Sequence, residues 1–259
     1  MDILGLKNKM IDSIKKRSLE FFNTNGLPSK KLENWKFTSS KNFKNFNKSL
    51  SSDEIKKIES DELSIVFING VLDKDSLENF KFAHLIEVKN LNELTKKELL
   101  YCSESFLNES MFNLGVSEFE NGSYISFKEN SVIEEVINIK NYFFENGQNE
   151  RMSSFNIFHM NEGSEISIIE EDIKENFSIF NLKLNKFICE NSSIFKHGKS
   201  YNDDSQTHSL SYNYYQIEQD VALSVDSMVK SSFFNKEFIE VDLNKVGSDA
   251  KINILNLGK

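Results

Sequence analysis

One cysteine and two histidines in the second half of the sequence have the side chains best suited to binding a metal. Cys189, His197 and His208 lie near one another along the chain, and thiolate and imidazole groups are good ligands for zinc or iron. Cys189 and His197 stand on the two sides of one expected turn, whereas the register of His208 to them is open. Because a small thiol is usually a packing residue, we expect a buried thiol, two surface imidazoles and no metal site.

A run of three acidic residues is the second candidate for chemistry. Glu170-Glu171-Asp172 could supply paired carboxylates to a β-helix enzyme that cleaves acidic polysaccharides with calcium. Neighbouring residues of a strand point to opposite faces, however, so three in a row do not converge on one substrate. Such an enzyme would also be secreted, and Leu4-Gly5-Leu6 is followed at once by Lys7 rather than by a signal-peptide core. We expect a solvated loop here and keep the polysaccharide-active enzyme as the alternative function.

Several other classes of function are disfavoured by composition. The sequence contains neither Gly-x4-Gly-Lys-Ser/Thr nor Gly-x-Gly-x-x-Gly, so nucleotide binding by those loops is not expected. A net charge of −9 argues against a dedicated nucleic-acid binder and against attraction to anionic membrane surfaces. No apolar run approaches the roughly eighteen residues of a transmembrane helix. Two cysteines favour a reducing compartment, which predicts a cytoplasmic protein.

A turn that returns at a nearly constant interval organises the chain after residue 123. Its centres are Gly163, Asn191, Asp220 and Gly247, at intervals of 28, 29 and 27 residues. The residues three positions later, Ile166, Ile194, Leu223 and Ala250, are all apolar, and we expect Ile166, Ile194 and Leu223 to stack in one inward column. Gly, Asn and Asp tolerate the left-handed backbone that a tight turn requires. A repeat of this length without a helical pattern predicts the coils of a parallel β-helix, and a β-sandwich with regular hairpins is the competing interpretation.

The first part of the chain has mixed signals instead. Apolar spacing predicts an amphipathic helix over 3–22, and an apolar run over 63–68 predicts a buried strand followed by a tight turn. Capping-box spacing indicates short helices at 51–60 and 95–102, and a further helical piece covers 105–114. The predicted fold is therefore mainly β, a right-handed parallel β-helix over 116–259 with an N-terminal α/β cap over 1–115.

The segment from Gly26 to Thr38 resembles the N-terminal signature of SufD proteins, which belong to the SUF machinery for iron–sulfur cluster assembly. The matching residues are Gly26, Leu27, Pro28, Glu33, Trp35, Lys36 and Thr38. Residues 66–70, 119–139 and 162–170 resemble further stretches of the family in the same order. We expect Trp35 to be a core anchor of the cap.

The resemblance implies a scaffold subunit and not an enzyme. It would pair with a SufB-like subunit, dock on the SufC ATPase, and contact an iron–sulfur cluster transiently without binding a cofactor tightly. The family's last β-helix coils, its cysteine- and histidine-containing motif and its ATPase-docking helices have no counterpart that we identify in residues 1–259. We therefore expect the ATPase-docking region to be absent from these residues, and no catalytic residue is predicted.

Overall fold

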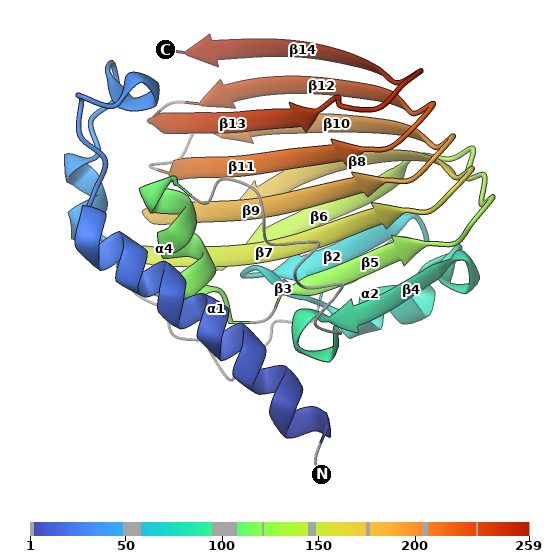
Figure 1. The fold of residues 1–259 in the computed structure, drawn as a ribbon, viewed down its shortest axis with the longest axis horizontal. Coiled ribbons are helices and arrows are strands. Elements are labelled where there is room, and N and C mark those ends of the chain that lie inside the picture. Colours follow the sequence, from blue (N-terminus) through green and yellow to red (C-terminus); the bar gives the residue numbers. More distant parts are fainter. Residues whose placement is uncertain are drawn as a thin grey trace.

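The protein is mainly β, and its centre is a parallel β-helix with helices and short strands at the N-terminal side, as predicted. The structure is a computed structural model that describes residues 3–48, 58–94, 108–120, 122–144, 149–174, 177–203, 207–231 and 233–258. Successive long strands alternate between two sheets, here called sheet A and sheet B. This alternation, visible in Figure 1, defines the coils.

Sheet A and sheet B are the two walls of the coils. Sheet A contains β4 (Ile86–Asn90), β5 (Ser123–Phe127), β7 (Glu150–Met160), β9 (Ile179–Cys189), β11 (His208–Ile217) and β13 (Phe234–Asp242), with β1 (Asn47–Lys48) beside β7. Sheet B contains β3 (Val71–Leu72), β2 (Ser64–Ile68), β6 (Ile137–Phe143), β8 (Glu165–Lys174), β10 (Ile194–Asp203), β12 (Ala222–Ser231) and β14 (Asp249–Gly258). The long strands pair in parallel, so the hairpins of a sandwich are not what forms this repeat.

Each coil turns through one residue with a left-handed backbone. These residues are Asn130, Gly163, Ser192, Asp220 and Gly247. The backbone N–H of Gly163 donates to the carbonyl of Asn191 in the next coil at 3.0 Å, and that of Ser192 donates to Gln219 at 2.9 Å. The ladder of hydrogen bonds between coils therefore continues through the turns.

One predicted turn centre is wrong by one residue. The left-handed residue is Ser192 and not Asn191. A one-residue shift exchanges the two faces of the following strand, so the predicted place of Ile194 is also wrong. Ile194 pairs with Glu165, and Phe195 takes its place between Ile166 and Leu223 in the inward column.

The interior of the coils, here called the lumen, is filled largely by aliphatic and aromatic side chains. The rings of Phe158, Phe187 and Tyr215 stack along sheet A, with centroids 5.3 Å and 4.7 Å apart. Residues from sheet B, including Ile168 and Val225, complete the same cluster. The lumen is therefore the first of two large cores.

A second core lies on the outer face of sheet A, under the N-terminal elements. Figure 1 shows α1 (Ile3–Asn25) and α4 (Ser110–Glu118) in front of this sheet. Trp35 of η1 (Glu33–Trp35) and Phe43 of η2 (Lys41–Asn45) join the same cluster. The remaining short elements are α2 (Lys74–Asn79), η3 (Ala83–Leu85) and η4 (Leu91–Glu93).

The helix predicted at 3–22 and the strand predicted at 63–68 are confirmed as α1 and β2. The helix predicted at 105–114 is found at Ser110–Glu118. The helices predicted at 51–60 and 95–102 fall wholly or mostly outside the described residues. Strands β2 and β4 of the first 115 residues pair with β6 and β5 of the rest, and the division at residue 115 stays a prediction.

Candidate functional site

The three candidate metal ligands do not come together. Cys189 ends β9 and is buried in the lumen, where burial raises the pKa of its thiol. His208 begins β11 and packs against Phe43 and Phe46 on the outer face of sheet A. Cys189 pairs with Ile217, nine residues beyond His208 along the strand, which corresponds to roughly 30 Å.

His197 and His208 are both buried, so the expectation that their imidazoles lie on the surface is wrong. His197 lies in the lumen and occupies the column position of Ile168 and Val225. In the sequence, the burial of His197 could have been inferred from its position, because the matching residues of the neighbouring coils are apolar. Within the described ranges no three His, Cys, Asp or Glu residues gather in a way that could hold a metal ion.

The remaining two histidines lie away from the lumen. His84 is exposed in η3. His159 lies on the outer face of sheet A, where its Nδ1 is 2.5 Å from the Tyr124 hydroxyl and its Nε2 is 3.0 Å from Glu190 Oε1. These contacts join successive coils. Cys102 lies outside the described residues.

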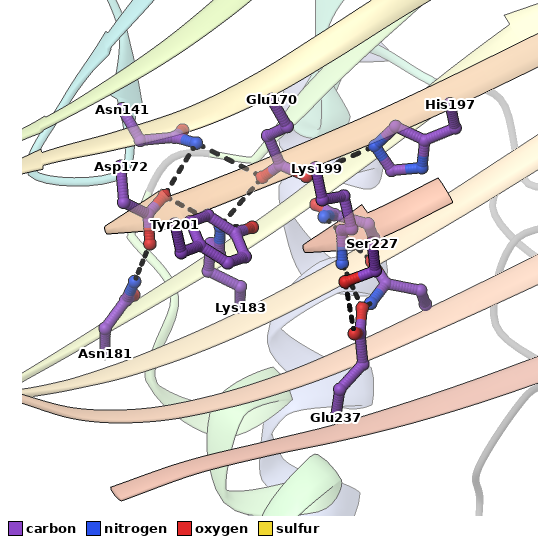
Figure 2. Close-up of polar contacts among 12 residues, drawn as sticks. Asn141, Glu170, Asp172, Asn181, Lys183, His197, Lys199, Tyr201, Ser227 and Glu237 are labelled. Carbon is purple, nitrogen blue, oxygen red and sulfur yellow. Dashed lines mark hydrogen bonds and ion pairs between the residues drawn. The ribbon is translucent and has the colours of Figure 1, made fainter. Parts of the chain in front are cut away.

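The acidic run is part of β8 and not a solvated loop, so that expectation is wrong. Glu170 and Asp172 face the lumen and Glu171 faces outward, as strand alternation requires. The two inward carboxylates belong to a network of buried polar side chains that connects sheet A with sheet B (Figure 2). We call this group the lumen network. Its members are Asn141, Glu170, Asp172, Asn181, Lys183, His197, Lys199, Tyr201, Asn213, Tyr215, Ser227 and Glu237.

Lys183 is the centre of the first half of the lumen network. It enters from β9 in sheet A, and its Nζ lies 2.8 Å from both Glu170 Oε1 and Asp172 Oδ1 of sheet B. The Asn141 amide donates to the same two carboxylates at 3.1 and 3.2 Å. Nζ also donates to the Tyr201 hydroxyl. These contacts join the opposite walls of the coil.

The second half of the lumen network has the charges reversed between the sheets. Lys199 of β10 forms an ion pair with Glu237 of β13. The Glu237 carboxylate also accepts hydrogen bonds from Asn213 at 2.8 Å and from Ser227 at 3.2 Å. Each wall therefore contributes both a cation and an anion.

His197 lies between the two halves. Its Nδ1 is 2.8 Å from the Tyr215 hydroxyl, and its Nε2 is 3.4 Å from Glu170 Oε2. Burial lowers the pKa of His197, although Glu170 opposes this effect. A neutral ring then donates from Nε2–H to the carboxylate and accepts from the Tyr215 hydroxyl at Nδ1.

Glu170, Glu237 and Lys183 of the lumen network have pKa values shifted in the direction that favours their charged forms. Burial would raise the pKa of Glu170, but Lys183, His197 and Lys199 together hold it well below its ordinary value. Burial opposes the charge on Lys183 as well, but Asp172 and Glu170 outweigh burial and raise its pKa. Three carboxylates thus face two lysine side chains, and their oxygen atoms are also contacted by asparagine amides, the Ser227 hydroxyl and the His197 ring.

This arrangement connects the two sheets and offers little to a large substrate. Glu170 is buried, and its carboxylate oxygens are within contact of Lys183, Asn141 and His197. A polysaccharide outside the coil cannot reach these oxygens. The alternative function therefore loses the carboxylates on which it depended.

The signature residues form a structural joint at the end of α1. Trp35 is only 1% exposed, and its indole N–H donates to Glu109 Oε1 at 2.7 Å. The other Glu109 oxygen caps α4 and accepts from the Tyr212 hydroxyl at 2.6 Å. The prediction that Trp35 anchors the cap is confirmed.

Other signature residues shape the same joint or face outward. Gly26 ends α1 with φ +65°, and the carbonyl of Pro28 accepts from Ser40 at 2.7 Å. Leu27 packs against the core, Glu33 and Lys36 are exposed, and Thr38 is partly buried.

The end of the β-helix formed by β13 and β14 exposes apolar side chains. These are the outermost described strands of sheet A and sheet B. Ile252 and Ile254 continue the inward columns of Val225 and Ser227 but are 41% and 52% exposed. Leu255 and Leu257 of β14 are also exposed. This surface, here called the coil end, has the character of an interface.

Two comparisons with known proteins found no similar family or protein. A scan against models of protein families found no match, and a search of curated proteins found no significant match. Among the described residues, no helix has the length and apolar character needed to cross a membrane.

Proposed function

We propose that this chain is a non-catalytic scaffold subunit in iron–sulfur cluster assembly, similar to SufD, that binds a SufB-like partner through its coil end. Two features support the proposal. One is the signature segment that forms the joint around Trp35, and the other is the β-helix that the resemblance implies. The coil end is the observation that carries the binding role.

Two features of the coil end suit it to pairing with further strands. Ile252 and Ile254 occupy positions whose counterparts in the preceding coil, Val225 and Ser227, are buried. In addition, β14 pairs with β12 on one side, and its other edge has backbone groups available for a further strand. Strands of a related β-helix would cover the apolar side chains and continue both sheets.

In this proposal the chain positions its partners and holds no cofactor tightly. A cluster contacts the complex transiently as its product, and ATP hydrolysis belongs to a SufC-type ATPase. The ATPase joins the complex that this chain forms with the SufB-like subunit.

Cluster assembly in a purified system tests this proposal. The SufB-like subunit and the ATPase are supplied with iron, a sulfur donor and ATP, with or without this chain. Cluster formation is followed by visible absorbance and by activation of an apo-protein. We expect this chain to raise the amount of cluster delivered, while the chain alone hydrolyses no ATP. If cluster delivery is the same without it, the proposed function is wrong.

A further inference from the structure

A basic segment beside the Trp35 joint differs in charge from the rest of the molecule. Residues 29–44 contain five lysines and one glutamate, in a chain whose net charge is −9. The lysines are Lys30, Lys31, Lys36, Lys41 and Lys44, and all are exposed. Among the described residues, none of these ammonium groups has a carboxylate within ion-pair distance. Their charge is therefore available to a partner.

The same segment presents exposed apolar side chains. Phe37 is 91% exposed, with Lys36 Nζ 5.5 Å from the centre of its ring, and Leu32 is 51% exposed. An exposed aromatic ring leaves a large apolar area in water, and aromatic side chains that become buried contribute strongly to the energetics of interfaces. We call Leu32, Phe37 and the five lysines the basic platform.

The basic platform is held in place by buried neighbours. Trp35, two residues before Phe37, is fixed to Glu109, and its carbonyl accepts the backbone N–H of Thr38 at 3.0 Å. On the other side, Phe43 stacks on Phe180 of β9 with ring centroids 4.5 Å apart. Because both ends of this loop are already anchored, binding of a partner would cost little free energy for ordering the loop.

We propose that the basic platform docks an acidic surface of a partner protein, with Phe37 entering an apolar pocket of that surface. The positive charge of the lysines favours a negatively charged partner surface. Phe37 and Leu32 form the apolar centre of the interface, from which water is excluded. A single-stranded nucleic acid would use several aromatic rings for successive bases, whereas Phe37 is the one highly exposed ring of this segment. A membrane surface would need a larger apolar face. This inference does not depend on the proposed role in cluster assembly.

Binding of a defined probe to the full chain tests the inference. The probe is a fluorescein-labelled peptide of sixteen residues, rich in Glu and Asp with a central pair of leucines, followed by anisotropy. The variants are Phe37→Ala and the pair Lys30→Glu with Lys36→Glu. Matched controls on the outer face of sheet B are Met228→Ala and the pair Lys196→Glu with Lys251→Glu. The residues are exposed in both sets, so each variant should keep the wild-type thermal midpoint.

We expect the peptide to bind the wild-type chain, and each platform variant to weaken binding by roughly tenfold or more, while the controls bind as wild type. Added salt should weaken binding. The inference is overturned if the peptide does not bind, or if platform and control variants bind equally. It is also overturned if a single-stranded DNA of sixteen nucleotides or a phosphatidylserine vesicle binds the platform more tightly than the peptide.

Discussion

At the scale of single residues, the interior of this β-helix depends on buried charges that are mutually paired. Lys183 stands between Glu170 and Asp172, and Lys199 stands beside Glu237. Replacing a whole buried ion pair with apolar residues is often neutral, whereas removing one member leaves an uncompensated charge. These residues should therefore show large effects when changed singly and smaller effects when changed together.

Replacing Lys183 with methionine should destabilise the fold strongly. The change leaves two buried carboxylates without their cation, which costs about 3–5 kcal/mol in the free energy of unfolding. Urea unfolding of the two proteins measures the difference. The control is Lys245→Met, which removes the largely exposed pair with Glu218 and should change stability little.

The combination of Lys183→Met with Glu170→Gln and Asp172→Asn should recover part of that loss, because no unpaired charge remains. If Lys183→Met is as stable as the wild type, the lumen network does not hold the sheets together.

Stability should fall in two stages as the pH is lowered. His197 is neutral in the fold with a pKa below its ordinary value of 6.5, so the unfolded chain binds the extra proton first and stability declines below about pH 6.5. Glu170 and Glu237 have pKa values below their ordinary 4.5. Their contribution is present above that pH and is lost as the pH falls towards the depressed values.

Unfolding free energies measured from pH 8 to pH 3 test this order. The His197→Gln variant should lose the first decline and keep the second. A wild-type stability that is flat from pH 7 to pH 5 would show that His197 does not titrate in this way.

At the scale of elements, the left-handed turns set the register of every coil. Gly163 has φ +66°, and a Cβ at this position would lie 2.5 Å from Asn130 Oδ1 of the preceding turn. The side chain of Asn130 thus occupies the space that a side chain at position 163 would need. Both the backbone conformation and the close approach favour glycine here.

Comparing two glycines separates these causes. Gly163→Ala should be destabilising by about 1–3 kcal/mol, since it adds a steric conflict to the backbone strain. Gly26 has a similar φ of +65° with nothing within 4 Å of its Cβ position, so Gly26→Ala should cost less. Thermal or urea unfolding compares the two variants. Equal losses would mean that the contact with Asn130 contributes nothing.

The sequence predicted the coils from these turns, but it did not predict the lumen network. Turns at Gly163, near residue 191, at Asp220 and at Gly247 recur at a nearly constant interval, and periodicity carries that information directly. In the turn between Gly163 and Asp220, Asn191 stands next to Ser192, and residue preference favours Asn191, whereas Ser192 has the left-handed backbone. The network required knowing that Lys183 of sheet A faces Glu170 of sheet B, which is a contact across the coil and not a repeat along it.

At the scale of the whole molecule, sheet A separates two cores. One core fills the lumen, and the other lies beneath α1, α4 and the Trp35 joint. The outer face of sheet A is covered by these N-terminal elements, whereas the coil end exposes Ile252 and Ile254. The two cores hold the molecule together, and we propose that the coil end binds the partner.

Measuring the affinity of this chain for a SufB-like subunit tests whether the coil end is the surface that binds this partner. The comparison uses two variants of neighbouring residues in β14, Ile254→Lys on the inward column and Asn253→Lys on the outer face, where Asn253 contacts Asp226. Isothermal titration of each against the SufB-like subunit gives the dissociation constants. We predict that the wild type and Asn253→Lys form a one-to-one complex and that Ile254→Lys weakens it by roughly a hundredfold or more. Absence of binding by the wild type, or equal binding by both variants, would show that the coil end does not bind a SufB-like subunit.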